Sequence, residues 1–334
     1  MADYKGIQGF SVQSLASDPP ASIGLGQLWY NSASNVWKIG AVGAGAWASG
    51  GNKNNYMSGG MGCGTQTAAL AAAGTGGTGP TPGNQILCEE YNGTGWAEVN
   101  GTPVAVRVCS GGGIQTSAIV AGGYSTEYMT ESFTYDGTNW TEVADINTAR
   151  EGAAGAASAS TAAIIAGGEG PNSISPRTTA LTEEYNGTSW TEKADLTTAR
   201  TLMAGIGTTT AALAVGGYIA LGNTEEWNGT SWTEVNDLTT ARNAAFKMGA
   251  GSTTSAMIVG GMTGPVGSTD VTEVYNGTCW TEVADLATSR TTGYGGGTQA
   301  LGIAAGGYQP GNANQIITEE WNGAPEAVQT VTTS

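Results

Sequence analysis

The stretch EEYNGTSWTEKADLTTAR, residues 183–200, recurs with small changes along the chain and decides the fold. Each copy carries a tyrosine or tryptophan anchor, and successive anchors are 44, 50, 42, 48 and 46 residues apart. The anchors are Tyr91, Tyr135, Tyr185, Trp227, Tyr275 and Trp321. A period in the forties is typical of repeat proteins, because one such unit cannot bury its own apolar face without a neighbour. The repeat therefore predicts an array of similar units, each packed on the next.

The unit between Arg150 and Arg200 divides into four short segments that favour strands. Its Asn186-Gly187 dipeptide predicts a hairpin with a type I′ turn, in which both central residues have positive φ. The run of small residues suits an innermost strand, where large side chains do not fit. Four-stranded sheets repeated radially make a β-propeller. The segments are GAAGAASAS (152–160), AAIIAGG (162–168), TEEYNG (182–187) and TSWTEKADL (188–196).

Several features recur in register and together resemble the Kelch repeat. An apolar strand ends in a Gly-Gly doublet, an anchor aromatic follows, a Trp lies five residues later, and an Arg lies ten or eleven residues after that Trp. The first unit departs, because Ala73-Gly74 replaces its doublet. The resemblance implies a Kelch-like β-propeller. The doublets are Gly122-Gly123, Gly167-Gly168, Gly216-Gly217, Gly260-Gly261 and Gly306-Gly307, and the matching arginines are Arg107, Arg150, Arg200, Arg242 and Arg290.

Counting these strands predicts an all-β fold with six blades, with seven blades as the alternative, closed by an N-terminal strand. The last unit has no Trp after Trp321, whereas Trp37 has no inner strands before it. We therefore expect the strand of Trp37 to complete the last sheet beside Trp321. If residues 28–30 and Trp37 instead form a separate hairpin, the tail at residues 326–331 must close the ring. The predicted domains are an extended arm, residues 1–30, and a propeller, residues 31–334.

Composition excludes several classes of function. The formal charge is −16, and so acidic a surface repels phosphate backbones, which argues against nucleic-acid binding. The sequence contains no histidine, so His-based triads and most zinc sites are excluded, and no metal or cofactor is predicted. No window approaches 18 apolar residues, and the first 22 residues lack the pattern of a signal peptide. We expect synthesis in a cytoplasm and no membrane insertion.

Cysteines and acidic pairs suggest no chemistry by their spacing. Cys63, Cys88, Cys109 and Cys279 have no CxxC spacing and are interpreted as isolated thiols, with a disulfide among the first three left open. Acidic pairs such as Glu183-Glu184 lie in strands, where adjacent residues point to opposite faces, and they recur in most units. A glycosidase needs one such pair, so we expect solvated or turn-bonded carboxylates.

Variation between units falls on one side of each blade. From doublet to anchor the distances are 17, 12, 17, 10, 14 and 14 residues, whereas the anchor-to-Trp spacing is constant. Loops on a rigid scaffold commonly carry binding residues, so the face with these loops is the predicted ligand-binding face. Tyr124, Tyr218 and Tyr308 directly follow doublets there, and Arg177 lies in a long loop. Aromatic rings at these positions suit stacking on sugars, with covering of the blade edge as the alternative.

The N-terminal segment SDPPASIGLGQLWYNSASNVWKIG, residues 17–40, is similar to a segment of virion proteins of tailed marine bacteriophages. This resemblance implies a non-enzymatic structural or adhesion protein, such as a decoration, tail or fibre component, located in the virion. Its propeller would bind host-surface glycans. Its arm would contact other virion proteins or copies of itself, with Trp29, Tyr30 and Trp37 as attachment or closure residues.

Two other hypotheses are weighed against this one. An N-terminal strand that completes the last blade of another copy would build an open-ended filament or surface layer, located on an extracellular surface. An enzyme on a propeller is the other, but copper chemistry of the galactose-oxidase type needs histidines, which the chain lacks. We therefore predict that the protein is not an enzyme.

Overall fold

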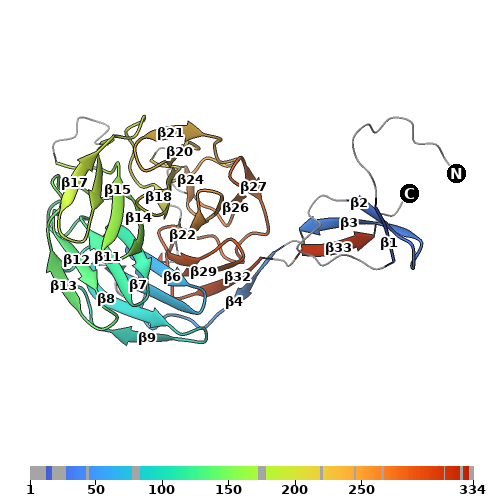
Figure 1. The fold of residues 1–334 in the computed structure, drawn as a ribbon. Coiled ribbons are helices and arrows are strands. Elements are labelled where there is room, and N and C mark those ends of the chain that lie inside the picture. The colour runs from blue at the N-terminus through green and yellow to red at the C-terminus, as the bar shows by residue number, and fades with distance from the viewer. Residues whose placement is uncertain are drawn as a thin grey trace. The chain divides into compact units, whose positions relative to one another are not determined.

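The computed structural model describes residues 13–16, 28–42, 45–76, 83–171, 178–218, 221–243, 246–264, 267–311, 313–323 and 326–330. Within these ranges every regular element is a β-strand, which confirms the all-β prediction (Figure 1). Arg177 and most of the predicted arm lie outside the described residues. No helix in the described ranges is long and apolar enough to cross a membrane.

Contacts divide the chain into two units, one formed by residues 46–322 and the other by residues 1–45 with 323–334. The predicted boundary between arm and propeller was a single one, after residue 30. In the smaller unit the sheet order is β1 (Gln13–Leu15), β2 (Leu28–Asn31), β3 (Val36–Val42) and β33 (Glu326–Thr330). Segments from both parts of the chain therefore share one small sheet.

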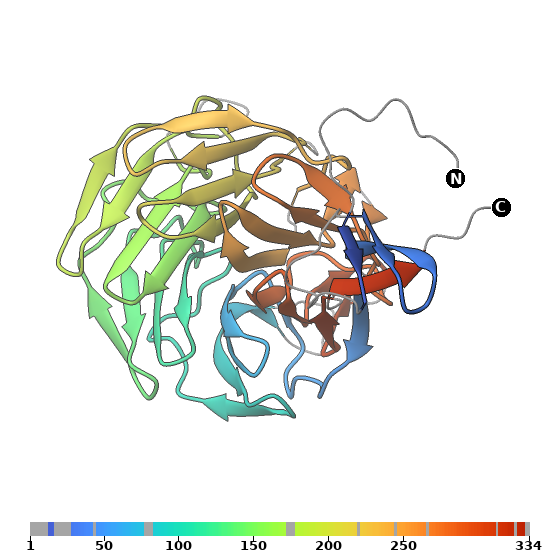
Figure 2. The same ribbon diagram turned by 45° about the vertical axis from the view of Figure 1, so that its right-hand side comes forward.

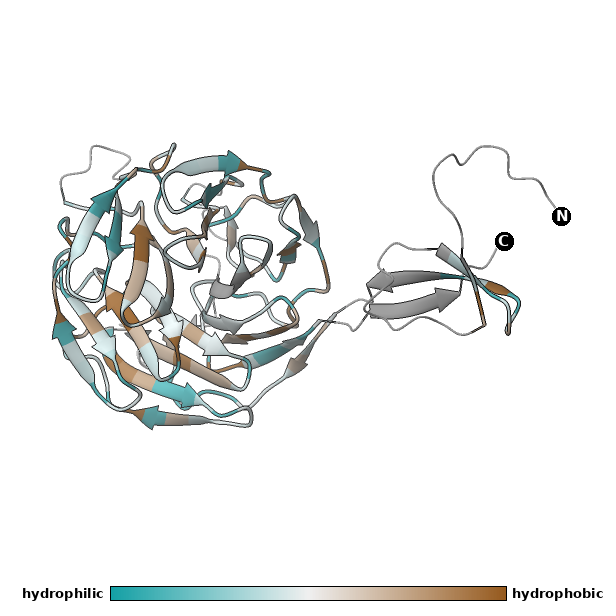
Figure 3. Cartoon of the chain, in the orientation of Figure 1, coloured by the Kyte–Doolittle hydropathy of each residue, from teal (hydrophilic) through white to brown (hydrophobic). Residues whose placement is uncertain are grey.

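Three repeats in the larger unit fold as separate sheets of four antiparallel strands in chain order. Residues 154–193 give β14 (Ala154–Ala159), β15 (Ala162–Ala166), β16 (Thr182–Tyr185) and β17 (Trp190–Lys193). Alternation of side chains puts one face of each strand against the next sheet. Hydrophobic residues gather on β15, whereas β17 is largely hydrophilic (Figure 3). Two further sheets repeat this order: β10 (Ser110–Ile114), β11 (Ser117–Ala121), β12 (Ser132–Tyr135) and β13 (Trp140–Val143), then β18 (Ala204–Gly207), β19 (Ala212–Val215), β20 (Thr224–Trp227) and β21 (Trp232–Val235).

The remaining repeats belong to larger sheets. In the first repeat, β5 (Met57–Ser58) joins β6 (Met61–Thr65), β7 (Ala68–Gly76), β8 (Gly83–Tyr91) and β9 (Trp96–Val99). The last two repeats form one eight-stranded sheet, because β22 pairs with β28 at a single position. Its two halves are β22 (Phe246–Ser252), β23 (Ser255–Val259), β26 (Thr272–Tyr275) and β27 (Trp280–Glu282), then β28 (Tyr294–Gly297), β29 (Leu301–Ala305), β32 (Thr318–Asn322) and β4 (Ala46–Ser49). Short hairpins pair β24 (Met262–Gly264) with β25 (Gly267–Ser268) and β30 (Tyr308–Gln309) with β31 (Ala313–Asn314).

The first strands of the repeats surround a common centre (Figures 1 and 2). Each contacts the next in the cyclic order β6, β10, β14, β18, β22, β28 and β6 again. Glycines allow this crowding, since a Cβ on Gly155 would lie 2.3 Å from the backbone nitrogen of Gly111. A hollow of about 30 Å³ lies at the centre, lined by residues of β6, β10, β14 and β18.

Backbone hydrogen bonds run around this centre just before the first strands. Val108 N–H donates to Gly59 O, Gly152 N–H to Val108 O, and Leu202 N–H to Gly152 O, at 2.6–2.9 Å. Gly59 N–H in turn donates to Thr292 O at 2.6 Å. These five residues all have positive φ, between 50° and 69°. A shared left-handed backbone conformation therefore links neighbouring repeats.

The strand that completes the last repeat is β4, not the strand of Trp37. β4 pairs with β32, and Trp47 lies opposite Trp321 with ring centroids 5.4 Å apart. Trp47 Nε1 donates to Thr272 Oγ1, as Trp280 Nε1 does to Thr224 Oγ1 one repeat earlier. Trp47 thus occupies the outer-strand Trp position of the repeat, and the prediction for Trp37 is wrong.

Trp37 lies in β3, which forms a separate hairpin with β2, as the sequence analysis allowed. The tail strand β33 pairs with β3 and not with β32, so the tail does not complete the last repeat either. The sequence misled here because AWAS, residues 46–49, lacks the repeat motif, while SNVWKIG matches a strand pattern better.

The hairpins lie where the sequence predicted, but their turns differ from the prediction. Tyr185 pairs with Trp190, which leaves a four-residue loop instead of a two-residue one. Asn186 Oδ1 accepts hydrogen bonds from the N–H groups of Thr188 and Ser189. Only Gly187 in this loop has positive φ, so the turn is not type I′. The asparagine acts through its side chain, as an Asx turn does.

Candidate functional site

The tyrosines that follow the doublets lie at equivalent places on one face of the larger unit. Tyr124 forms an isolated β-bridge with Arg107, and Tyr308 forms one with Thr291. Arg107 and Thr291 each directly precede a residue with positive φ. Tyr218 N–H donates to Thr201 O in the same way. Tyr218 is 51% exposed and Tyr308 41% exposed. The loop face, defined here as the face that carries these tyrosines, therefore presents two exposed aromatic rings.

Tyr124 differs from the other two because other side chains engage its ring. The Arg107 guanidinium lies 4.7 Å from the ring centroid, and Tyr128 packs against the ring at 89° with centroids 5.4 Å apart. Asn84 Nδ2, from the preceding repeat, donates to the carbonyls of Tyr124 and Ser125. Tyr124 is therefore a support for its neighbours more than a free stacking surface.

A hydrogen bond joins two neighbouring repeats beside this cluster. Tyr128 OH donates to Glu169 Oε1 at 2.9 Å. A hollow of about 720 Å³, lined by neither Tyr128 nor Glu169, is within the size range of small-molecule sites. Its lining combines apolar surface with the hydroxyl groups of four threonines and the amide of Asn147. The lining residues are Thr130, Asn147, Thr148, Ala149, Arg150, Gly170, Pro171, Thr178, Thr179 and Leu181.

The predicted attachment residues lie in the smaller unit, in strands β2 and β3. Trp29 is 3% exposed, whereas Trp37 is 40% exposed. Tyr30 and Trp37 lie opposite each other in the register, and their rings meet edge to face with centroids 5.5 Å apart. The structure therefore brings Tyr30 and Trp37 together, while Trp29 faces the other side of the sheet.

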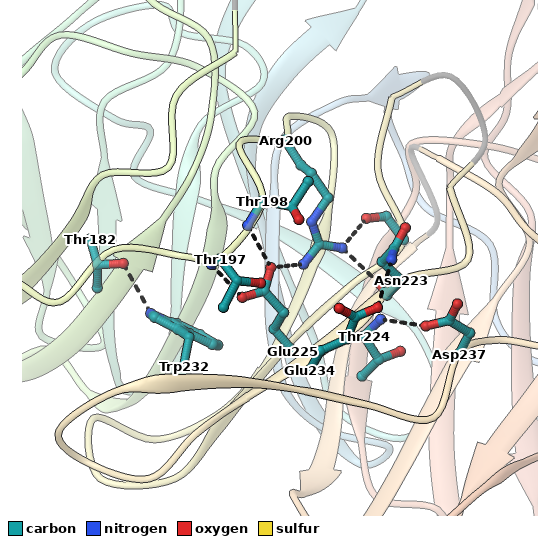
Figure 4. A network of polar contacts seen from close by, with 11 residues as sticks. Thr182, Thr197, Thr198, Arg200, Asn223, Thr224, Glu225, Trp232, Glu234 and Asp237 are labelled. Atoms are coloured by element: carbon teal, nitrogen blue, oxygen red, sulfur yellow. Dashed lines mark hydrogen bonds and ion pairs between the residues drawn. The ribbon is translucent and has the colours of Figure 1, made fainter.

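Buried ion pairs account for the acidic residues of the repeat, and sequence reasoning missed them. Glu225 in β20 is 1% exposed, and its carboxylate lies 2.9 Å from Arg200 Nη2 (Figure 4). It also accepts the N–H of Thr197 at 2.7 Å, while Arg200 Nη1 donates to the carbonyls of Gly216 and Asn223. Burial lowers the pKa of the Arg200 guanidinium, which Glu225 partly offsets. We had expected a solvated or turn-bonded carboxylate; the first glutamate of the pair instead forms a buried ion pair and also accepts loop N–H groups.

The same clamp recurs with two variations. In the first repeat Lys53, 2% exposed, replaces the arginine and lies 3.0 Å from Glu89. The second repeat has no such clamp. In the other repeats with an arginine, that arginine lies four residues before the first strand, and here this position holds Val106. Phe133 takes the position of the glutamate. Both are buried in one hydrophobic cluster. Val106, and not Arg107, is therefore the counterpart of Arg150. The prediction that Arg107 matches the arginines of the other repeats is wrong by one position. The other clamps are Arg150–Glu183, Arg242–Glu273 and Arg290–Glu319.

The second glutamate of a pair points to the opposite side of the strand, as expected. Glu90 accepts a hydrogen bond from Tyr135 OH, and Glu320 accepts one from Tyr91 OH. These bonds join adjacent repeats. Among the described residues no group of three or more Cys, Asp or Glu side chains is arranged to hold a metal ion.

Comparisons with known proteins identify the fold and no family. No protein-family profile matches the chain, and no curated protein matches it significantly. Among solved structures, one titled "Structure of YjhT" matches with a TM-score of 0.66 and 11% sequence identity, over 84% of this chain and 99% of that chain. At this identity the match shows a propeller-like all-β fold and carries no function.

Proposed function

We propose that this chain is a non-enzymatic virion protein whose propeller binds glycans on a host surface. The observation that carries the proposal is the loop face, where Tyr218 and Tyr308 stand at equivalent positions and are both about half exposed. Exposed aromatic rings stack on the apolar faces of sugars, and nearby polar groups fix orientation. The hollow beside Thr130 and Thr179 supplies such polar groups on the same side of the repeats.

The binding head in this proposal is a Kelch-like propeller of six blades, closed by β4. The cyclic order of first-strand contacts and the pairing of β4 with β32 support this arrangement. Closure through an N-terminal strand gives the last blade the same four-strand order as the others. A rigid ring then holds the loops of the loop face in fixed positions, which is how scaffolded loops bind.

The smaller unit is the proposed attachment part. Its sheet contains segments from both sides of the propeller in sequence, β1–β3 and β33. The edge-to-face pair of Tyr30 and Trp37 leaves Trp37 40% exposed, and exposed aromatic residues are enriched at protein interfaces. Its partner would be another virion protein or a second copy of this chain. The similarity of residues 17–40 to phage virion proteins is what points to a virion.

A glycan-array measurement with the full chain tests the binding part of the proposal. We expect retention of at least one class of polysaccharide, with the mass of the retained sugar unchanged after prolonged incubation. Released sugar products would contradict the non-enzymatic assignment, and retention of no glycan would contradict the binding assignment.

The virion location needs a second measurement. Phage particles from a host that produces this chain are purified by density gradient and analysed by mass spectrometry. We expect its peptides to co-purify with capsid or tail proteins at constant stoichiometry. Peptides found only in the soluble fraction would contradict the proposal.

A further inference from the structure

Arg107 differs from the other basic side chains that the structure describes in detail. Arg150, Arg200, Arg242, Arg290 and Lys53 each contact a buried glutamate, and Lys193 contacts Glu184. Arg107 is half-buried on the loop face, and its guanidinium makes neither a hydrogen bond nor an ion pair with any residue in the described ranges. The chain carries a net charge of −16, so a cation without a carboxylate partner is unusual on it.

The structure holds this guanidinium in place without using its donors. It lies over the Tyr124 ring, a cation–π contact that leaves the N–H groups at its edge available. Tyr124 is fixed by Tyr128 and by the bonds from Asn84 to its backbone. The backbone of Arg107 is fixed as well, because its N–H and C=O both bond to Tyr124. Such preorganisation lowers the entropy lost when a ligand binds.

We infer that Arg107 binds the anionic group of an acidic saccharide, a carboxylate or a sulfate. The inference rests on the proposed glycan-binding function and names the ligand class for the same loop face. A guanidinium edge matches planar or tetrahedral oxyanions with two parallel hydrogen bonds, which adds geometric specificity. Glu169, held by Tyr128 on the neighbouring repeat, is an acceptor for sugar hydroxyls, so the cluster offers both kinds of partner. A neutral sugar would leave the Arg107 charge without a counter-charge.

Small monosaccharide probes test this without multivalent effects. Galacturonate, galactose 6-sulfate and galactose are titrated into the full chain, and binding is followed by ligand-observed NMR. We expect galacturonate or galactose 6-sulfate, or both, to bind at least about 10-fold more tightly than galactose. The stronger of the two identifies the anionic group. Equal binding of all three sugars would overturn the inference, and so would the absence of any binding.

Variants separate the role of Arg107 from folding. Arg107→Gln should lose about 10-fold or more in affinity for the anionic probe, and Arg107→Lys should retain part of it. The melting temperature should hardly change, because no ion pair is broken. Lys193→Gln, which removes a partly exposed cation elsewhere, is the control and should bind as the unmodified chain does. An Arg107→Gln protein that binds the acidic probe normally would refute the inference, while glycan retention on the array would still support the proposed function.

Discussion

Positive backbone φ angles recur at fixed places in the repeat, and some of these places carry side chains. Ala73 has a φ of 58°, where the matching residues Gly122 and Gly167 have 57° and 69°. A Cβ at Gly167 would lie 2.4 Å from Met203 Cε and 2.6 Å from Arg200 O. The doublet therefore needs glycine for conformation and for space, and the first repeat has adapted its surroundings to one extra methyl group.

This contrast gives a prediction for two opposite substitutions. Gly167→Ala should lower the free energy of unfolding by about 2 kcal/mol or more, since it adds both backbone strain and overlap. Ala73→Gly should change it by less than about 1 kcal/mol, because relief of strain is offset by the loss of a buried methyl group and by glycine's entropy. Urea denaturation measures both. Equal effects would show that the doublet positions are not under the constraint described.

Thiol burial gives a second residue-scale prediction. Cys63, Cys88 and Cys109 are buried and Cys279 is exposed, all as free thiols. Burial raises the pKa of Cys63 to about 12 and that of Cys88 to about 11, so little thiolate exists at neutral pH. A thiol reagent at pH 8 should modify one cysteine in the native protein and four after denaturation. Rapid native modification of Cys63 or Cys88, seen by mass spectrometry, would contradict the packing of the first repeat.

At the scale of elements, the repeats show two solutions to one packing problem. Four repeats bury an Arg–Glu clamp and one a Lys–Glu clamp, whereas the second repeat buries Val106 and Phe133 at the same positions. A buried ion pair contributes little net stability compared with a well-packed apolar pair, yet removing one partner leaves an uncompensated buried charge. The second repeat is thus a natural replacement of the whole pair.

Transfer of the apolar pair into another repeat tests this interpretation. Arg200→Val or Glu225→Phe alone should each cost about 3–5 kcal/mol, because either leaves a buried charge unpaired. The double variant should be more stable than either single variant by about 2 kcal/mol or more. Denaturant midpoints of the four proteins give the comparison. Lys193→Met breaks a partly exposed pair and, as the control, should cost less than about 1 kcal/mol. Additive losses in the double variant would argue that the clamp itself is required.

Sequence alone predicted the elements that rest on local signals and missed those that rest on distant pairing. The hairpins follow from Tyr185, Asn186 and Trp190, which are close in sequence. The clamp of Arg200 with Glu225 joins residues 25 positions apart on different segments, and no local pattern indicates that pairing. The exposed face of Tyr218 and Tyr308 was predicted because loop length varies there, whereas the contact of Arg107 with Tyr124 needed coordinates.

For the whole molecule, the important feature is how the last repeat is completed. Residues 46–49 lie some 270 positions before their partner strand, so among the strand pairs of the larger unit this one closes the longest loop. Trp47 then contacts Trp321 and Thr272, in the places that Trp residues hold in other repeats. Contacts between repeats stabilise such arrays, so loss at this junction should also affect the neighbouring repeats.

Two tryptophan variants test whether β4 completes the last repeat. Trp47→Ala should lower the melting temperature of residues 46–322 and increase hydrogen exchange in β28, β29 and β32, with a cost of about 3–5 kcal/mol. Trp37→Ala, in β3, should leave exchange in these strands unchanged, because Trp37 pairs within the smaller unit. If Trp37→Ala loosened the larger unit and Trp47→Ala did not, β4 would not be the strand that completes the last repeat.

If the loop face binds the ligand, substitutions on it should weaken binding, whereas substitutions at the opposite end of the sheets should not. Leu301 begins strand β29 and is 49% exposed, whereas Tyr308 lies beyond the other end of β29, on the loop face, and is 41% exposed. Ile114 ends strand β10, at the end of the second repeat that corresponds to the Leu301 end of the last repeat, and is 48% exposed. Affinity for the polysaccharide retained on the array is measured for two double variants. One combines Tyr218→Ala with Tyr308→Ala, and the control combines Ile114→Ala with Leu301→Ala. We expect a loss of about 10-fold or more for the tyrosine variant and no change for the control variant. Equal affinities, or a loss confined to the Ile114 and Leu301 variant, would contradict this expectation.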